Sequence, residues 1–558
     1  MNKLGRFSSC RGVSFEIQPP GSGPFAVLPP TLEESQQQPV KNVWLPWNQK
    51  SSFRVFPYSS NELQSSIRRP SSHFCDLEDV DDDEYENEVA ESIFEGDDEE
   101  EDYDVEQPKS VRIPSKRDQQ APKVSKPRQS RLSVILLDQG LFTVYKRLFV
   151  VCLTINVVCL VLAATGSFPY ARKKATLFSI GNILALTLCR SEALLRIIFW
   201  LAVKVLGRSW VPLSLKTATT SFLQCLGGVH SGCGVSSVIW LVYSLVLTLK
   251  DRDNTSTAII AVASTILALL CLSCLAAFPL VRHLHHNVFE RSHRFAGWTA
   301  LLLVWAFIFL TLSYDPITKS YDNLRLSKLI KEQEFWLTFA ITIVIILPWL
   351  TVRRVPVMVS AQSGHASIIK FEGGVKAGIL GRISPSPLSE WHAFGIISDG
   401  KNEHMMLAGA VGDFTKSLVS KPPSHLWVRQ VHFAGLPYLI NMYDRVLLVA
   451  TGSGICVFLS FLLQPCSAEV CILWVAKGIE QNFGKEITEA VKGFPKDKVI
   501  VHDTAVSGRP NVSEMSIDTA KRWGAEAVFV TSNPEGSRDV VNACKGAGIA
   551  AFGPIWDS

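Results

Sequence analysis

The chain has 558 residues, of which 47% are hydrophobic and 19% are charged. Soluble proteins usually carry about 25% charged residues. This deficit, together with 30 Phe and 14 Trp, indicates surface that faces lipid. The formal net charge of +4 is too small to predict a nucleic-acid partner. These values exclude a single soluble globule, a fibrous protein and a disulfide-stapled secreted module.

The first part of the chain, residues 1–135, is rich in Pro, Ser and Gln and is predicted to be a disordered, acidic cytosolic tail. Residues 76–106 contain 19 Asp or Glu and no Lys or Arg. Such a density of carboxylates cannot bury enough apolar surface to fold by itself. The run is a docking segment for a protein partner, a clamp on the basic stretch that follows it, or a solvated tail.

Residues 145–354 are predicted to form a bundle of about six transmembrane helices in the lipid bilayer. A crossing needs ~20 apolar residues to span ~30 Å of hydrocarbon. The apolar runs that reach or approach this length are 148–166, 217–249, 256–280, 295–314 and 335–352. A further run, 175–206, is interrupted by Arg190, Glu192 and Arg196. We interpret it as one crossing with an interfacial continuation.

An even number of crossings places both ends of the chain on the same side of the membrane. Residues 109–147 contain ten Lys or Arg, and Arg353 and Arg354 follow the last apolar run. Because positively charged flanks stay in the cytosol, both termini are expected to be cytosolic. The basic run 172–174 would then face outward, against this rule.

After residue 355 the composition becomes that of soluble domains. Short alternating segments separated by Gly, Pro and Ser turns predict a small antiparallel β-barrel over 355–440. Strands alternating with helices predict a parallel α/β domain over 441–558. Its first strand leads into a turn with Gly452 and Gly454, where a backbone can approach a pyrophosphate. A plain tight turn is the alternative interpretation.

Several motifs occur in a fixed order along the chain. They are Gly-Gly-Val-His-Ser-Gly-Cys (227–233), His-Asn-Val-Phe-Glu-Arg-Ser-His-Arg-Phe (286–295), Arg382-Ile383-Ser384, Trp391-His392-Ala393-Phe394, Gly412-Asp413-Phe414-Thr415, Gly452-Ser453-Gly454-Ile455 and the final Gly-Pro-Ile-Trp-Asp-Ser. With the membrane region, they resemble the ferric reductase and NADPH oxidase superfamily. The nearest branch is its plant and fungal integral-membrane, ferredoxin-reductase-like one, whose plant members often carry an adenylate-forming reductase label. The resemblance covers about residues 145–558.

The resemblance implies that the barrel binds FAD. His392 and Phe394 are similar to the flavin motif His-Pro-Phe, with Ala393 in place of proline. Arg382 would meet the flavin diphosphate, and Thr415 would lie near the flavin ring system or its phosphates. The implied flavin-binding residues are Arg382, Ser384, His392, Phe394, Gly412 and Thr415. The alternative for Arg382 and His392 is a polar position on the barrel surface.

The resemblance also implies that the α/β domain binds NAD(P)H. The residues for its phosphate groups would be Gly452, Ser453, Gly454 and Ile455. Arg509 would contact a 2′-phosphate, which favours NADPH, or is simply a turn arginine. The chain departs from the superfamily at 456–457, where Cys-Val replaces the common Gly-Pro. A proline there would pre-form the first helical turn.

Haem ligands are implied on the third and fifth crossings, where ferric reductases carry two pairs of histidines. A haem iron takes one imidazole on each face. Here His230 and His293 occupy the inner pair, whereas the outer positions hold Tyr243 or Ser244 and Ala306 or Phe307. The sequence therefore predicts at most one haem b. Helix-packing histidines and a non-haem metal are the alternatives.

The favoured interpretation is a membrane flavoprotein oxidoreductase that passes electrons from NAD(P)H through FAD to a haem or to an unknown acceptor on the cytosolic side. The other interpretation is a non-catalytic membrane scaffold or sensor derived from a decayed ferric-reductase-like protein. In that case the acidic tail would be the partner site.

Overall fold

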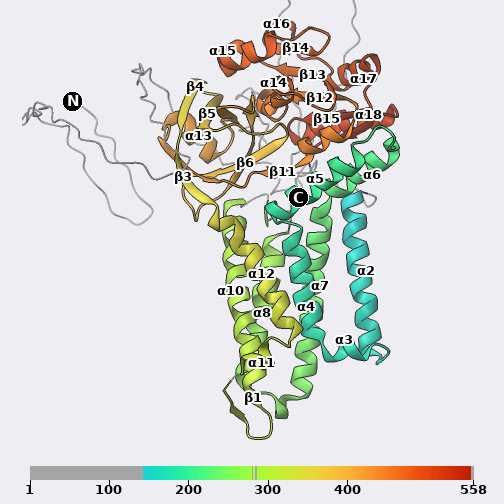
Figure 1. Cartoon of the computed structure of the whole chain (residues 1–558), viewed down its shortest axis with the longest axis vertical. Helices are drawn as coiled ribbons and strands as arrows, with labels where there is room; N and C mark the ends of the chain where they lie inside the picture. Colours follow the sequence, from blue (N-terminus) through green and yellow to red (C-terminus); the bar gives the residue numbers. More distant parts are fainter. Residues whose placement is uncertain (1–142, 279–280, 283–285, 324, 555–558) are drawn as a thin grey trace, which may run out of the picture. The chain divides into compact units, whose positions relative to one another are not determined.

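The computed structural model describes residues 143–278, 281–282, 286–323 and 325–554. All of them belong to one unit, residues 68–558. The predicted disordered tail and the last four residues lie outside this described part. Figure 1 shows the described helices and strands, coloured along the sequence.

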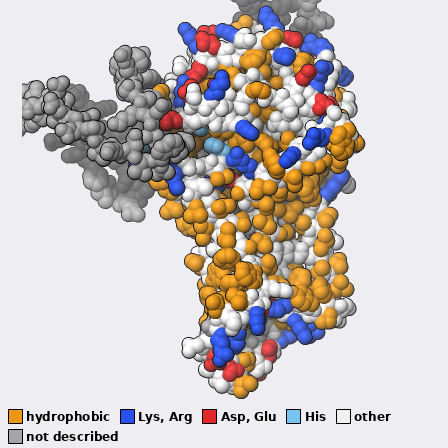
Figure 2. All heavy atoms as spheres, viewed as in Figure 1, with side chains coloured by type: hydrophobic (Ala, Val, Ile, Leu, Met, Phe, Trp, Pro, Cys, Tyr) orange, Lys and Arg blue, Asp and Glu red, His pale blue; other side chains and the backbone are white. Residues whose placement is uncertain are grey.

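Five described helices are long and apolar enough to cross a membrane. They are α2 (Val144–Ala164), α7 (Leu226–Lys250), α8 (Thr257–Ala276), α10 (His286–Ser313, apolar over Val288–Ser313) and α12 (Gln333–Leu350). On the face drawn in Figure 2, hydrophobic side chains cover these helices almost continuously, and charged side chains gather at the end that carries β1 and α11. Five of the about six predicted crossings therefore correspond to helices that are long and apolar enough to span a membrane.

The remaining apolar run, 175–206, forms two helices instead of one crossing with a continuation. Helix α4 (Ala175–Leu188) and helix α5 (Glu192–Leu206) are separated at Ser191, whose side chain caps α5 by accepting from the Leu194 amide. Lys174, just before α4, pairs with Glu332, just before α12. Glu192, just after α4, pairs with Arg429 of the strand region. Helix α4 therefore runs between the two ends of the bundle, although its 14 residues are only about 21 Å long.

The third predicted crossing was placed too early. Its first residues belong to a separate helix, α6 (Leu213–Gln224), and the crossing helix α7 begins only at Leu226. In α6, Thr220 shares a hydrogen bond of 2.8 Å with the Tyr443 hydroxyl, and Lys216 is buried. These polar contacts hold α6 against the α/β region and keep it out of the apolar bundle.

The small residues of the 227–233 motif let α7 approach α2 closely. A Cβ atom added to Gly228 would lie 2.2 Å from the Tyr145 carbonyl oxygen, and one added to Gly232 would lie 2.9 Å from Cys152 Cβ. The spacing Gly-x-x-x-Gly puts both on one face of α7, as in many close membrane-helix pairs. The close approach is supported by a hydrogen bond of 2.8 Å between Tyr145 and Ser231.

A polar network joins three helices inside the bundle. The side-chain oxygen Oδ1 of Asn156 in α2 accepts a hydrogen bond from the side-chain amide of Asn182 in α4 at 2.8 Å and another from the Trp240 indole of α7 at 2.9 Å. Hydrogen bonds of this kind stabilise helix pairs in membranes, where burial of apolar surface offers little driving force. All three side chains are satisfied, so the network is structural.

The strands after the bundle form two antiparallel sheets. One has the order β11-β6-β10-β3 with β7 paired to β6, and the other has the order β4-β5-β9-β8. The predicted antiparallel strand region is confirmed, but among the described residues the sheets do not close into a barrel. Their strands are β3 (Val352–Pro356), β4 (Met358–Ser363), β5 (Ala366–Glu372), β6 (Ile379–Ser384), β7 (His392–Gly395), β8 (Ile397–Ser398), β9 (Glu403–Gly409), β10 (His425–Arg429) and β11 (Phe433–Ala434).

The last part of the chain is the predicted parallel sheet, with helices between its strands. Its order is β14-β13-β12-β15-β16. Successive strands are added on one side of β12 up to β14 and then on its other side from β15, so the topological switch point lies between β12 and β15. The strands are β12 (Arg445–Thr451), β13 (Glu469–Ala476), β14 (Val499–Asp503), β15 (Ala527–Thr531) and β16 (Ala550–Phe552). Ligands of open α/β sheets bind at such a switch point, outside the carboxyl ends of the strands.

The connecting elements complete the described part. They are α3 (Pro169–Lys173), η1 (Arg252–Asn254), β1 (Tyr314–Asp315), β2 (Ser320–Tyr321), α11 (Leu326–Leu329), α13 (Asp413–Ser420), η2 (Leu436–Met442), η3 (Gly452–Val457), α14 (Ser460–Leu463), α15 (Ile479–Lys492), α16 (Thr504–Ser507), α17 (Val512–Trp523) and α18 (Pro534–Gly546).

Candidate functional site

Two histidines from different crossing helices lie beside each other. His230 comes from the second turn of α7 and His293 from the second turn of α10. Their ring centres are 6.4 Å apart, with the ring planes inclined by 50°, and both side chains are half-buried. The fold therefore brings together the pair that the sequence singled out.

Hydrogen bonds determine which nitrogen of each ring carries the proton. His230 Nδ1 lies 3.0 Å from the Leu186 carbonyl oxygen, and His293 Nδ1 lies 3.4 Å from that of Ser273. Because a carbonyl oxygen only accepts, each Nδ1 must be the donor, and each neutral ring keeps its lone pair on Nε2. Metal-ligating histidines usually donate their other ring N–H in this way.

The spacing of the rings fits two axial ligands of one iron. An imidazole nitrogen lies about 2 Å from a bound metal and about 1 Å from its ring centre, so two opposed ligands place their ring centres roughly 6 Å apart. The observed 6.4 Å is close to this value. Among the described residues no group of three or more His, Cys, Asp or Glu is arranged to hold a metal ion.

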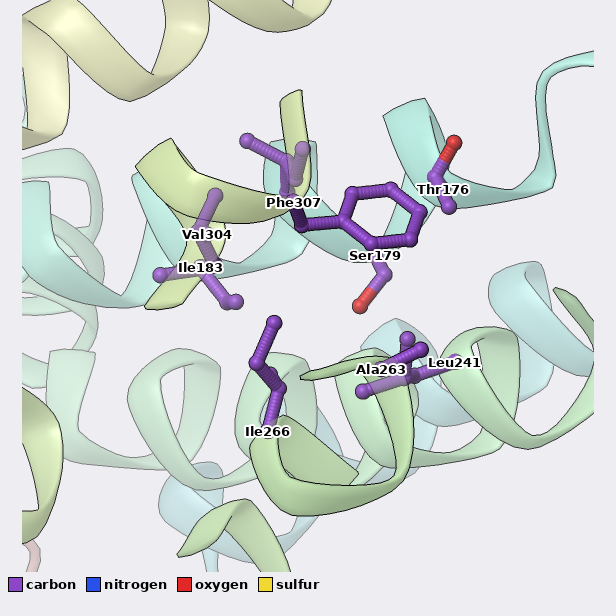
Figure 3. Close-up of a pocket in the computed structure, with 9 residues that line it drawn as sticks. Thr176, Ser179, Ile183, Leu241, Ala263, Ile266, Val304 and Phe307 are labelled. Carbon is purple, nitrogen blue, oxygen red and sulfur yellow. The ribbon is translucent and has the colours of Figure 1, made fainter. Parts of the chain in front are cut away.

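At the other end of the bundle, the positions that the resemblance to ferric reductases implies for a second ligand pair hold Tyr243 or Ser244 and Ala306 or Phe307. Of the positions that hold the outer ligands in ferric reductases, Phe307 projects into a small apolar cavity beside Leu241 and Val304 (Figure 3). The cavity volume is about 20 Å³, room for about one water molecule and far below the ~150 Å³ that admits benzene.

The flavin motifs of the two antiparallel sheets come together in part. The His392 ring of β7 stacks on the Phe414 ring at the start of α13, with centres 4.5 Å apart and planes 9° apart. Thr415 Oγ1 accepts from the amides of Val411 and Gly412 at 3.1 and 3.0 Å. The Thr415 hydroxyl thus caps its own helix, and Gly412 is part of that cap.

The other flavin residues have partners inside the protein as well. Arg382 Nε of β6 lies 2.5 Å from Glu192 Oε1, and its guanidinium lies over the Phe433 ring at 5.0 Å. Ser384 is buried and donates to the Ser386 carbonyl at 2.6 Å. Phe394 is buried in the core. Arg382 alone of these three is partly exposed, at 33% of its side chain, so it remains the best candidate for an anionic ligand.

Sequence reasoning missed the partner of Arg382. Glu192 is 8% exposed and also accepts from Arg429 at 2.8 Å, whose guanidinium lies over the Trp391 ring at 4.8 Å. Burial lowers the pKa of Arg429, and the Glu192 carboxylate opposes this shift. Two guanidinium groups share one carboxylate, so the cluster carries excess positive charge. A charged residue within an apolar run was the available signal.

The predicted dinucleotide turn lies where a ligand of a parallel sheet would bind. Gly452 follows β12 at the switch point with φ of +52°, and its carbonyl accepts from the Trp474 indole at 2.9 Å. All six residues of η3 are buried, and Ser453 Oγ has no hydrogen-bond partner among the described residues. Because the turn is buried, a ligand can contact it only if neighbouring residues of the protein move away.

Gly454 within this turn and Gly395 of β7, which packs against it, leave no room for a side chain. A Cβ on Gly454 would lie 2.7 Å from the Thr531 carbonyl oxygen, and one on Gly395 would lie 2.8 Å from Val457 Cα. Arg509 is exposed in the loop between α16 and α17, beyond the edge strand β14. The structure therefore does not join Arg509 to the turn by any contact among the described residues.

A pair of histidines in the antiparallel sheets makes the region sensitive to acid. Burial, the neighbouring His404 and Arg196 lower the pKa of His432 to about 4. Because an unfolded histidine titrates near 6.5, stability is complete above that pH and is lost as the pH falls from about 6.5 to about 4. The loss from His432 amounts to roughly 3 kcal/mol.

We therefore expect His432→Gln to reduce the loss of thermal stability between pH 7 and pH 4.5, measured on the detergent-solubilised chain. The control is His425→Gln at an exposed position of β10, which should keep the wild-type pH dependence. Equal acid sensitivity of wild type and His432→Gln would contradict this assignment.

Parts of the chain are similar in sequence to known proteins. A family model described as adenylate-forming reductase 03009, C-terminal domain, matches residues 436–558. Adenylate-forming reductase 06235 of Coprinopsis cinerea is 34% identical over 437 residues, covering 76% of this chain and 41% of that protein. Adenylate-forming reductase 03009 of the same fungus is 33% identical over 435 residues, with the same coverage. The chain thus spans about two fifths of the length of these curated relatives.

Solved structures with similar parts cover about 36% of this chain. They include CYP116B46 from Tepidiphilus thermophilus (TM-score 0.30, 12% identity, 29% of that chain), phthalate dioxygenase reductase (0.29, 11%, 68%) and ferredoxin-NADP+ reductase from Plasmodium falciparum in complex with 2′P-AMP (0.28, 11%, 93%). The two adenylate-forming reductases, by contrast, are similar to this chain over 76% of its length.

Proposed function

We propose that this chain is a membrane oxidoreductase that receives electrons from NAD(P)H at a flavin and passes them to a single haem between His230 and His293. The histidine pair carries the proposal. Two Nδ1 atoms directed at main-chain carbonyls, and ring centres 6.4 Å apart, are the arrangement expected of two axial ligands.

The residues of the pair perform distinct tasks in this proposal. The Leu186 and Ser273 carbonyls hold the Nδ1 protons, which keeps each Nε2 unprotonated and available as a ligand. The apolar side chains of the crossing helices would limit the access of water to the site. A haem held there would accept and release one electron at a time.

The strand region would hold the flavin. The two positive charges of Arg382 and Arg429 are only partly neutralised by the one carboxylate of Glu192. The remaining positive charge would favour a ligand with a diphosphate. His392, stacked on Phe414, would border the ring system. FAD would convert the hydride of NAD(P)H into single electrons, and the α/β region with its Gly452 turn is the proposed site for the nucleotide.

We also propose that the chain crosses the membrane six times, with α4 as the second crossing and both tails on the cytosolic side. The pairs Lys174–Glu332 and Arg291–Glu390 lie at the starts of α4 and α12 and of α10, respectively. The first pair puts the starts of α4 and α12 at one end of the bundle, so the proposed second and sixth crossings run in the same direction, as six crossings require. The second pair puts the start of α10 beside the strand region, where α12 ends, so α10 and α12 run in opposite directions. With no outer ligand pair, electrons would leave on the cytosolic side or within the inner leaflet.

A second function is supported by a specific observation. The η3 turn is completely buried, and the Thr415 hydroxyl is used by its own helix cap. These features favour a non-catalytic membrane scaffold or sensor in which the nucleotide sites have become structural.

The test is a visible spectrum of the full chain purified in mild detergent. We expect one haem and one flavin per chain, and reduction of both when NADPH is added without oxygen. A colourless protein would support the scaffold, and two haems per chain would contradict the assignment of His230 and His293 as the single ligand pair.

A further inference from the structure

The first turns of α10 hold the loop that leads into the flavin motif. Arg294 Nη1 donates to the main-chain carbonyls of Leu388 and Ser389 at 3.2 and 3.0 Å. The Trp391 amide donates to Glu290 Oε1 at 3.3 Å, and Arg294 and Glu290 form an ion pair. Two side chains of one membrane helix therefore bind the main chain of loop 385–391 at three points.

These side chains are enclosed, which distinguishes them from an ordinary surface contact. Arg294 is 12% exposed and Glu290 25%. The guanidinium of Arg294 also lies 5.9 Å from the centre of the Trp349 ring at the end of α12. A neighbouring ion pair on the same helix, Arg291 with Glu390, is open to solvent on the arginine side, at 53%. Exposed pairs of that kind contribute little to stability.

The loop itself is braced, so that it moves as one piece. The Trp391 indole donates to the Pro387 carbonyl at 3.1 Å, and the hydroxyls of Ser386 and Ser389 share a hydrogen bond of 2.9 Å. Its far end continues directly into His392 of β7. A displacement at Arg294 would therefore reach His392 through a short, rigid segment.

His293 lies inside the same helical segment as the residues that bind the loop. Glu290 precedes it by three residues and Arg294 follows it directly. Positions i and i+3 of a helix are neighbours on its surface. The candidate haem ligand and the candidate flavin loop are thus joined by side chains within one turn of each other.

We propose that Arg294 and Glu290 are positioning residues that fix the distance between the flavin loop and His293 and thereby set the rate of electron transfer between them. The role rests on the proposed function. Electron tunnelling falls steeply with distance, so a change in the separation of the two cofactors changes the rate of electron transfer between them. A contact that only stabilises the fold would not change this rate when both cofactors remain bound.

The experiment uses the full chain in detergent and two readouts. Arg294→Gln is compared with Arg291→Gln, the matched control on the same helix. The first readout is hydrogen exchange of the peptide that contains residues 386–395. We expect about tenfold faster exchange in Arg294→Gln and wild-type exchange in the control.

The second readout is the rate at which NADPH reduces the haem, followed at the Soret band. In Arg294→Gln we expect this rate to fall about tenfold or more, with the Soret position, the haem content and the flavin content of the wild type. Arg294→Lys, which keeps the charge beside Glu290, should recover part of the rate. The control should stay within about twofold of the wild type.

Unchanged exchange in Arg294→Gln would overturn the proposal, and so would an unchanged rate in a variant with both cofactors. An equal loss of rate in Arg291→Gln would also overturn it, because the effect would then be unspecific. Absence of flavin or haem in the wild-type spectrum is a separate result: it refutes the proposed function, and this role with it, before any variant is made.

Discussion

Replacing either His230 or His293 with alanine is expected to abolish haem binding. The two rings are opposed, with Nδ1 of each on a main-chain carbonyl. Removal of one ring leaves one axial ligand, and none of the described groups of His, Cys, Asp or Glu forms a substitute metal site. The Soret band of the purified chain should disappear in each variant, and the iron content should fall from one per chain to near zero.

The matched control for this result is His425→Ala. His425 is exposed on β10, away from the membrane helices, and its loss should leave the Soret band unchanged. A Soret band of wild-type intensity in both His230→Ala and His293→Ala would refute the ligand assignment. Loss of the band together with loss of folded protein would instead show that the two rings are packing residues. The unfolding transition of each variant distinguishes these outcomes.

Replacing Gly228 with alanine is expected to destabilise the bundle by about 3 kcal/mol or more. The added methyl group would lie 2.2 Å from the Tyr145 carbonyl oxygen, which belongs to the main chain of α2 and has no rotamer to change. The two helices must separate, and the hydrogen bond between Tyr145 and Ser231 is then lost. Unfolding of the purified chain by titration with a denaturing detergent measures the change.

The same helix provides the control. Gly234 has no atom within 4 Å of the position where its Cβ would lie. Because alanine is the better helix former, Gly234→Ala should be neutral or slightly stabilising. If Gly228→Ala and Gly234→Ala unfold at the same detergent concentration, α7 and α2 are not packed through the Gly-x-x-x-Gly face.

The sequence alone determined the features that depend on local pattern. Long apolar runs predicted the membrane helices, because nearly every residue of such a helix is apolar. Alternation of strands with helices predicted the parallel sheet over β12–β16. The resemblance to ferric reductases singled out His230 and His293 as a candidate ligand pair, and the structure places their rings 6.4 Å apart.

Boundaries between helices were harder, because apolar composition continues through them. The prediction that the third crossing begins at Thr217 was wrong, since α6 ends at Gln224 and α7 begins at Leu226. What separates them is the binding of α6 to Tyr443, more than 200 residues later in the chain. No pattern within residues 213–250 contains that information.

Only the tertiary structure decided how the site is assembled. Arg382 was predicted from a motif, but its contact with Glu192 joins residues 190 positions apart. Thr415 was predicted to bind a flavin, and the structure shows that its hydroxyl accepts hydrogen bonds from amides of its own helix cap. Arg294 and Glu290 belong to the 286–295 motif, but only the structure shows that they bind the main chain of loop 385–391. A sequence specifies which groups a residue offers, whereas the partner that uses them is set by packing between distant segments.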